Sequence, residues 1–200
     1  NVVAVEEQLL LERLLEQSKP ALPAGARELH YLLATPFRYA SPVGSRFRAA
    51  SQPGIWYGAE HLRTCCAELG YWRWRFLTDS PALSSLGPSP QTVFRARIHA
   101  RSIDLTRTPF RRARAVWTHP LDYGATQDLA ATARAAGVEA IRYESVRDPQ
   151  HAPAVAVLSP AVFRPPRPTE QQTWLLTVRA EAVTWHRDQD AFEFPTRPWH

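Results

Sequence analysis

The chain has 200 residues, of which 44% are hydrophobic and 22% are charged, an ordinary composition for a folded globular protein. No apolar run approaches the roughly 18 residues that a membrane-spanning helix needs, so we expect no association with a membrane. The net charge of +5 comes almost entirely from arginine, because Lys19 is the only lysine. Guanidinium groups suit phosphate or carboxylate partners, although a bias in codon composition would also explain the excess.

The two cysteines, Cys65 and Cys66, are adjacent in the sequence. Neighbouring side chains of a helix point about 100° apart, so these two thiols do not suit a disulfide with each other. We interpret them as reduced residues of a cytoplasmic protein. The sequence has no glycine-rich nucleotide loop and no zinc-ligand spacing, so we expect no metal site and no permanently bound cofactor.

Residues 2–17 are predicted to form an amphipathic helix, and a linker containing proline follows it. Residues 28–34 are predicted to be a strand, because their larger apolar side chains alternate. Arg38, Arg46 and Arg48 come next, within eleven residues. These arginines could cradle a pyrophosphate or lie in a solvated loop, and the sequence leaves both alternatives open.

Residues 54–76 are predicted to form a short strand, a turn and a helix. Tyr57 lies at the end of the strand, and Glu68 lies beside the apolar face of the helix. A carboxylate in that position costs free energy unless a cation or a hydrogen-bond donor meets it. The stretch therefore fits a pocket built on Tyr57 and Glu68, and it also fits a solvated helix residue beside an amphipathic edge residue.

Trp72, Trp74 and Phe76 alternate with arginines near the end of this helix. The pattern fits stacking on nucleic acid, but we interpret it as aromatic rings that pack on the body while the arginine side chains extend to solvent.

The remaining predicted elements alternate between strands, loops and one helix. A Ser/Pro/Gly loop over 80–90 precedes a half-buried strand over 91–98, and an Arg/Pro-rich segment over 107–114 is interpreted as an exposed loop. An alanine-rich helix over 126–136 ends at Gly137, and a strand over 138–146 carries Ser145 near its end. A buried strand over 154–158, a proline-rich spacer over 162–168 and a strand or hairpin over 174–185 follow. The tail after residue 188 either packs on the surface or is loose.

Three segments taken together resemble the RES-domain family, toxins of bacterial toxin–antitoxin pairs named for an Arg, a Glu and a Ser. They are FRYASPVGSRF (37–47), GIWYGAEHLRTCCAE (54–68) and GVEAIRYESVR (137–147). Their order and spacing agree over roughly residues 29–163. One departure is Arg48, where the family usually has a small polar residue.

The resemblance implies an α+β fold similar to ADP-ribosyltransferase toxins, a mixed split β-sheet core with flanking helices. It also implies NAD⁺ as substrate. It assigns catalytic roles to Glu68, Tyr57, Arg38 and Ser145. The residues expected to bind NAD⁺ are Arg38, Tyr39, Arg46, Arg48, Tyr57 and Ser145. Glu68 would stabilise the ribosyl cation left when nicotinamide departs, and water or phosphate would capture that cation.

The resemblance further implies an antitoxin partner with a helical DNA-binding domain and leaves open a homodimer within such a complex. We expect an N-terminal helix and linker (1–25), a catalytic domain (26–165) and a C-terminal strand or hairpin extension (166–200). Two other functions stay open: a mono-ADP-ribosyltransferase that modifies a protein, and a non-catalytic basic module that binds nucleic acid or an acidic partner. The set of Glu68, Tyr57 and Arg38 argues against the last, so we do not expect direct binding of nucleic acid.

Overall fold

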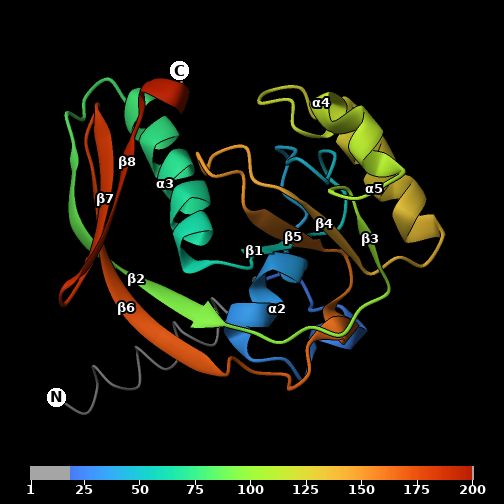
Figure 1. Cartoon of the computed structure of the whole chain (residues 1–200). Coiled ribbons are helices and arrows are strands. Elements are labelled where there is room, and N and C mark those ends of the chain that lie inside the picture. Colours follow the sequence, from blue (N-terminus) through green and yellow to red (C-terminus); the bar gives the residue numbers. More distant parts are fainter. Residues whose placement is uncertain (1–18, 200) are drawn as a thin grey trace, which may run out of the picture.

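The computed structural model describes residues 19–199, so the helix expected over residues 2–17 lies outside the described part of the chain. The described chain folds into two four-stranded sheets with helices between and beside them (Figure 1). This arrangement confirms the predicted α+β class with a split sheet. The α-helices are α2 (Tyr31–Arg38), α3 (Leu62–Thr78), α4 (Arg114–Trp117) and α5 (Gly124–Ala135).

The first sheet has the strand order β1-β5-β4-β3 and is mixed, because only the β3–β4 pair is parallel. β5 pairs with both β1 and β4, and its small residues Ala154 and Ala156 are fully buried. The strands are β1 (Trp56–Ala59), β3 (Ser102–Asp104), β4 (Ala140–Glu144) and β5 (Pro153–Val157).

The second sheet is antiparallel, with the order β2-β6-β7-β8. Its first strand comes from the middle of the chain, and the other three come from the C-terminal region that we expected to be an extension. The hairpin expected over 174–185 is confirmed as the β6–β7 pair, and β8 extends it into a three-stranded meander that continues the sheet begun by β2. The strands are β2 (Leu86–Arg95), β6 (Glu170–Val178), β7 (Ala182–Arg187) and β8 (Asp190–Pro195).

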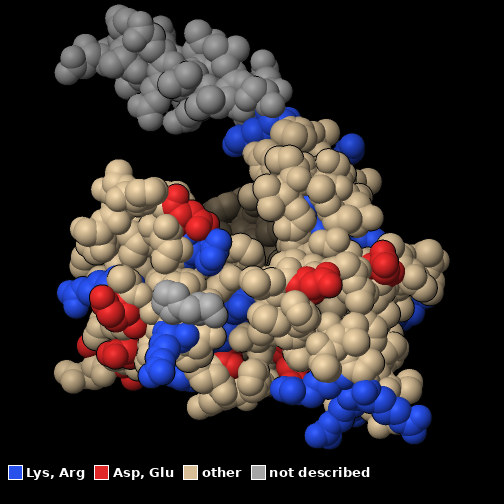
Figure 2. Space-filling model, turned by 90° about the horizontal axis from the view of Figure 1, so that it is seen from above, with Lys and Arg blue, Asp and Glu red and all other residues tan. Residues whose placement is uncertain are grey.

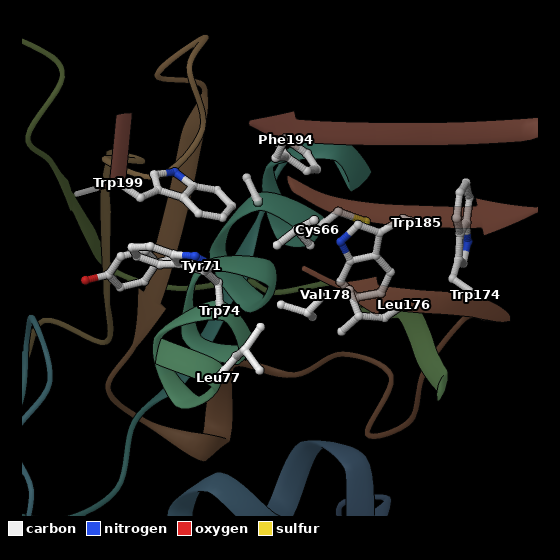
Figure 3. Packing of buried hydrophobic residues seen from close by; sticks show 12 residues of the cluster. Cys66, Tyr71, Trp74, Leu77, Trp174, Leu176, Val178, Trp185, Phe194 and Trp199 are labelled. Carbon is white, nitrogen blue, oxygen red and sulfur yellow. The ribbon is translucent and has the colours of Figure 1, made fainter. Parts of the chain in front are cut away.

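Helix α3 lies between the two sheets and contacts strands of both (Figure 1). Its inward side joins an aromatic cluster with β6, β7 and β8, in which Tyr71 and Trp74 meet Trp185, Phe194 and Trp199 (Figure 3). The tail after residue 188 is thus packed rather than loose, because it supplies β8 and a final turn whose Trp199 is buried. A second cluster joins the first sheet to α5, and a third surrounds α2.

The strand predicted over 28–34 is wrong, because residues 28–30 form a turn and residues 31–34 begin helix α2. His30 caps the helix, its Nδ1 accepting a hydrogen bond from the Leu32 amide at 3.3 Å. Leu33, Ala34 and Phe37 then face the core with helical spacing, while Tyr31 is exposed. The alternation that suggested a strand is too short to distinguish from one face of a helix.

Two predicted loops are also partly wrong. Residues 86–90 belong to β2 despite Pro88 and Pro90, because β2 is an edge strand and its pairing with β6 is irregular between Leu86 and Ser89. Residues 110–113 form a 3₁₀ turn that continues into α4. The helix over 126–136 is confirmed as α5, and Gly137 has the positive φ of 72° expected of a residue that ends a helix.

The interpretation of the tryptophan-rich end of α3 is correct for one side chain and wrong for the other two. Trp74 is buried and its Nε1 donates to the Ala180 carbonyl at 3.1 Å. Trp72 and Phe76 are more than half exposed. Positions 72 and 76 lie on the opposite side of the helix from position 74, so alternation along the sequence cannot bury all three rings.

Candidate active site

A cavity of about 520 Å³ lies between the two sheets. Its walls come from β1, from α3 as far as residue 72 and from residues of β2, β4, β6 and β7, with further side chains from loops before β1, before α5 and after β4. A space-filling view shows the surface hollowed between two lobes (Figure 2). The lining includes the polar side chains of Glu68, Arg46 and Arg147 as well as the apolar side chains of Trp56, Leu69 and Phe94.

Glu68 lines this cavity, and the fully buried Ser145, 77 residues away in the sequence, meets its carboxylate without lining the cavity itself. The Ser145 hydroxyl donates a hydrogen bond to Glu68 Oε1 at 2.5 Å. The same hydroxyl accepts hydrogen bonds from the amides of Arg147, at 3.3 Å, and Asp148, at 3.1 Å. Because two donors occupy the lone pairs of the Ser145 oxygen, its proton is directed at the carboxylate. Ser145 is thus placed to orient Glu68.

The environment of Glu68 disfavours its charged form. Burial raises the pKa of this carboxyl above its ordinary value, and the hydrogen bond from Ser145 and the charges of Arg46 and Arg147 lower it by less. The nearby Asp148 carboxylate adds to the rise. A carboxylate whose charged form is disfavoured by burial, and which lies in a cavity near two guanidinium groups, is typical of a functional site.

Two phenols line the same cavity as the carboxylate. The Tyr57 hydroxyl accepts a hydrogen bond from the Phe47 amide at 3.0 Å and lies 2.9 Å from Ser45 Oγ, while the tyrosine side chain lines the cavity. Tyr143 also lines the cavity and is buried. Burial raises the pKa of both phenols, so both stay protonated at neutral pH.

Two arginines line the cavity from opposite loops. Arg46 Nη1 donates to the carbonyls of Trp117, at 3.1 Å, and His119, at 3.0 Å, and its guanidinium lies 4.7 Å from the ring centre of Tyr123. Arg147 lies over the ring of Tyr71 at 3.6 Å, and Nη2 donates to the Pro120 carbonyl at 2.6 Å. Both side chains are buried. Backbone carbonyls and aromatic faces hold both guanidinium groups in place.

The other predicted ligands lie elsewhere. Arg38 is the last residue of α2 and Tyr39 follows it, and neither is among the described residues that line the cavity. Arg48 is buried, and its guanidinium donates to the carbonyls of Ser41, Val43 and Ala49, which closes the loop before β1. The structure therefore brings together Arg46, Tyr57, Glu68 and Ser145 of the predicted set.

Arg147, Tyr123 and Tyr143 were not predicted as site residues. Tyr143 lies on β4, two residues before Ser145, so alternation along the predicted strand could have indicated it, whereas Arg147 lies in the loop after β4. Tyr123 lies in a loop 55 residues from Glu68 and carried no signal. Asp148 was also missed; it accepts a hydrogen bond from Thr64 Oγ1 at 2.8 Å and so ties the start of α3 to the loop that carries Ser145.

The fold and site together define an α+β protein with a half-buried carboxylate near two arginines in an inter-sheet cavity. Over residues 19–199, no group of three or more His, Cys, Asp or Glu could hold a metal ion, and no helix is long and apolar enough to cross a membrane. A family model described as the RES domain matches residues 22–179. The chain belongs to the RES domain family, as its three sequence blocks predicted. A comparison with curated proteins finds no significant match.

Proposed function

We propose that this protein cleaves the bond between nicotinamide and ribose in NAD⁺ and thereby consumes it. The observation that carries the proposal is the pairing of Glu68 with Ser145, in a cavity lined by Arg46, Arg147 and Tyr57. A fixed carboxylate suits a substrate that becomes positively charged at its sugar, and fixed guanidinium groups suit a pyrophosphate.

The reaction needs little acid catalysis, because the nicotinamide of NAD⁺ already carries a positive charge. The bond from the ribose C1′ to nitrogen breaks, its electron pair neutralises the nicotinamide, and the sugar becomes an oxocarbenium ion. Glu68 accepts a hydrogen bond from the ribose 2′-hydroxyl and offsets the charge on the sugar. Water then attacks C1′ and releases a proton to solvent, which gives nicotinamide and ADP-ribose. Phosphate in place of water gives the corresponding sugar phosphate.

The other side chains position the dinucleotide. Tyr57 stacks on the nicotinamide half, since its side chain lines the cavity while its hydroxyl is held by the Phe47 amide. Arg46 and Arg147 bind the pyrophosphate. We assign the second cationic position to Arg147 rather than to Arg38 or Arg48, because Arg147 lines the cavity and those two do not.

Membership of the RES domain family supports a role as the toxin of a toxin–antitoxin pair. We propose an antitoxin partner that carries a helical DNA-binding domain and covers the cavity, which would protect the cell from loss of NAD⁺. A cytoplasmic location and a homodimer within the complex are part of the same proposal.

Incubation of the purified chain with NAD⁺ tests the activity. We expect release of nicotinamide in equal amount to NAD⁺ lost, and Glu68→Gln should abolish it. The product identifies the acceptor: ADP-ribose indicates water, and its phosphorylated form indicates phosphate. Label on a protein from NAD⁺ carrying a tagged adenine would instead indicate a mono-ADP-ribosyltransferase.

Absence of NAD⁺ loss, together with salt-sensitive binding of nucleic acid, would overturn the proposal in favour of a basic binding module. The arginine-rich segment 107–114 is the natural surface for such binding. Two of its arginines already meet carboxylates, with Arg107 Nε 3.4 Å from Asp104 Oδ2 and Arg114 Nη2 2.6 Å from Glu144 Oε2. These pairs reduce the charge available to a polyanion.

A further inference from the structure

The final turn of the described chain, Arg197–Trp199, contacts the loop that carries Ser145 and Arg147. Trp199 Nε1 donates to the Arg147 carbonyl at 2.9 Å, and both residues are more than 90% buried. The RES domain match ends at residue 179, so this contact comes from a segment beyond the matched range.

Trp199 also contacts Arg147 indirectly, through Tyr71. The ring centres of Trp199 and Tyr71 are 5.8 Å apart and the rings are nearly perpendicular, at 88° (Figure 3). Tyr71 also contacts the Arg147 guanidinium, which lies 3.6 Å from its ring centre. The Trp199 indole thus holds the backbone of Arg147 directly. It also packs against Tyr71, the aromatic platform on which the Arg147 guanidinium lies.

We infer that Trp199 is a positioning residue for the cavity, which fixes Arg147 and the amides that orient the Ser145 hydroxyl. The expected change in NAD⁺ turnover rests on the proposed function. The expected shift of residues 145–148 rests on geometry alone. Loss of the indole N–H leaves the Arg147 carbonyl buried without its donor, so residues 145–148 must shift to satisfy it.

A shift of this loop changes the charges around Glu68. The charged and titratable groups around this carboxylate are Arg46, Arg147, Asp148, Tyr57, Tyr143 and Cys65. Of these, Arg147 comes from the loop that Trp199 holds and lowers the pKa of Glu68. Movement of Arg147 away from the carboxylate should therefore raise that pKa.

Trp199→Phe tests the inference, because phenylalanine keeps an aromatic ring against Tyr71 and removes the donor. The matched control is Trp174→Phe in the same aromatic cluster, because Trp174 stacks on Phe192 and its Nε1 donates to Gln172 Oε1 instead. The first measurement needs no substrate: hydrogen exchange of the Arg147 and Asp148 amides. We expect exchange about tenfold faster in Trp199→Phe and unchanged in Trp174→Phe.

The second measurement is steady-state turnover of NAD⁺. We expect KM to rise about five- to tenfold in Trp199→Phe with a smaller change in kcat, and the acid limb of kcat/KM to move to higher pH. In an Arg147→Gln background, Trp199→Phe should raise KM no further, since the two changes act through one side chain.

Unchanged amide exchange in Trp199→Phe, or equal acceleration in both variants, would overturn the inference. Additive effects of Trp199→Phe and Arg147→Gln on KM would overturn it as well. If the parent protein consumes no NAD⁺, the proposed function fails, and the exchange measurement alone decides whether Trp199 positions the loop. If Trp199→Phe does not fold, Tyr71→Leu, which removes the platform and keeps the indole donor, should raise KM by a similar factor.

Discussion

One face of α3 packs Trp74 and Leu77 against the C-terminal sheet, whereas a second face, on the other side of the helix, turns Glu68 toward the cavity. On the first face, the buried groups are apolar or have a partner such as the Ala180 carbonyl for Trp74 Nε1. On the second, burial disfavours the charge of Glu68, and its neighbours offset that effect only in part. The first face stabilises the fold. The second face carries the Glu68 carboxyl, which does not stabilise the fold and is therefore more readily explained by function.

This contrast teaches where each kind of substitution should act. Apart from Tyr71 and Trp199, which contact Arg147, changes in the aromatic cluster should alter the unfolding equilibrium and leave the activity of each folded molecule intact. Replacement of the Glu68 carboxyl should alter activity and leave stability equal or higher.

The largest expected effect is on activity, from Glu68→Gln. The amide keeps an oxygen that can accept the Ser145 hydrogen bond but cannot offset a positive sugar, so turnover of NAD⁺ should fall by about 100-fold or more. The midpoint of thermal unfolding should not fall, because a carboxyl with a raised pKa is replaced by a neutral group. Nicotinamide release and thermal melts measure the two quantities. A variant as active as the parent would remove Glu68 from the mechanism.

The largest effect on stability is expected from Trp74→Ala. Removal of this buried indole should lower the free energy of unfolding by about 3–5 kcal/mol. Trp72→Ala is the matched control, two residues away on the same helix, because Trp72 is 52% exposed and its loss should cost far less. Denaturant unfolding of both variants measures the difference. Equal losses would mean that α3 does not pack on the face described.

A smaller effect on activity is expected from Ser145→Ala. Glu68 loses its hydrogen-bond donor, and the Arg147 and Asp148 amides lose their acceptor, so activity should fall about 10- to 100-fold. Because the lost hydrogen bond favours the carboxylate, the pKa of Glu68 should rise further, and the acid limb of kcat/KM should move to higher pH. Ser145→Thr, which keeps the hydroxyl, should restore part of the rate. An unchanged acid limb in the alanine variant would contradict this role.

The smallest effect expected is the dependence of stability on pH. The pKa of Glu68 is raised above 4.5 in the folded protein, so the unfolded chain ionises first as pH rises. The stabilisation from protonated Glu68 is therefore complete below the unfolded pKa and is lost as pH rises through the folded pKa. The difference in unfolding free energy between Glu68→Gln and the parent should grow in favour of the variant over that window. A constant difference across the window would show that Glu68 has an ordinary pKa.

The sequence alone was enough for the α+β class, the family and most of the regular elements. It also placed Tyr57 and Glu68 on adjoining elements and Ser145 at the end of a strand, because a strand, a turn and a helix carry local signals of propensity and periodicity. Local signals failed at residues 31–38, where tertiary packing of Leu33, Ala34 and Phe37 favours a helix.

Only the tertiary structure decided which arginines face the cavity. Arg38, Arg46, Arg48 and Arg147 look alike in sequence, since a guanidinium carries no local signal of its partner. Carbonyls of the loop before β1 hold Arg48, while carbonyls of residues 117, 119 and 120 hold Arg46 and Arg147 beside Glu68. These contacts join residues up to 73 positions apart. Such pairings depend on how the sheets and α3 pack, because burial and charge act through space and not along the chain.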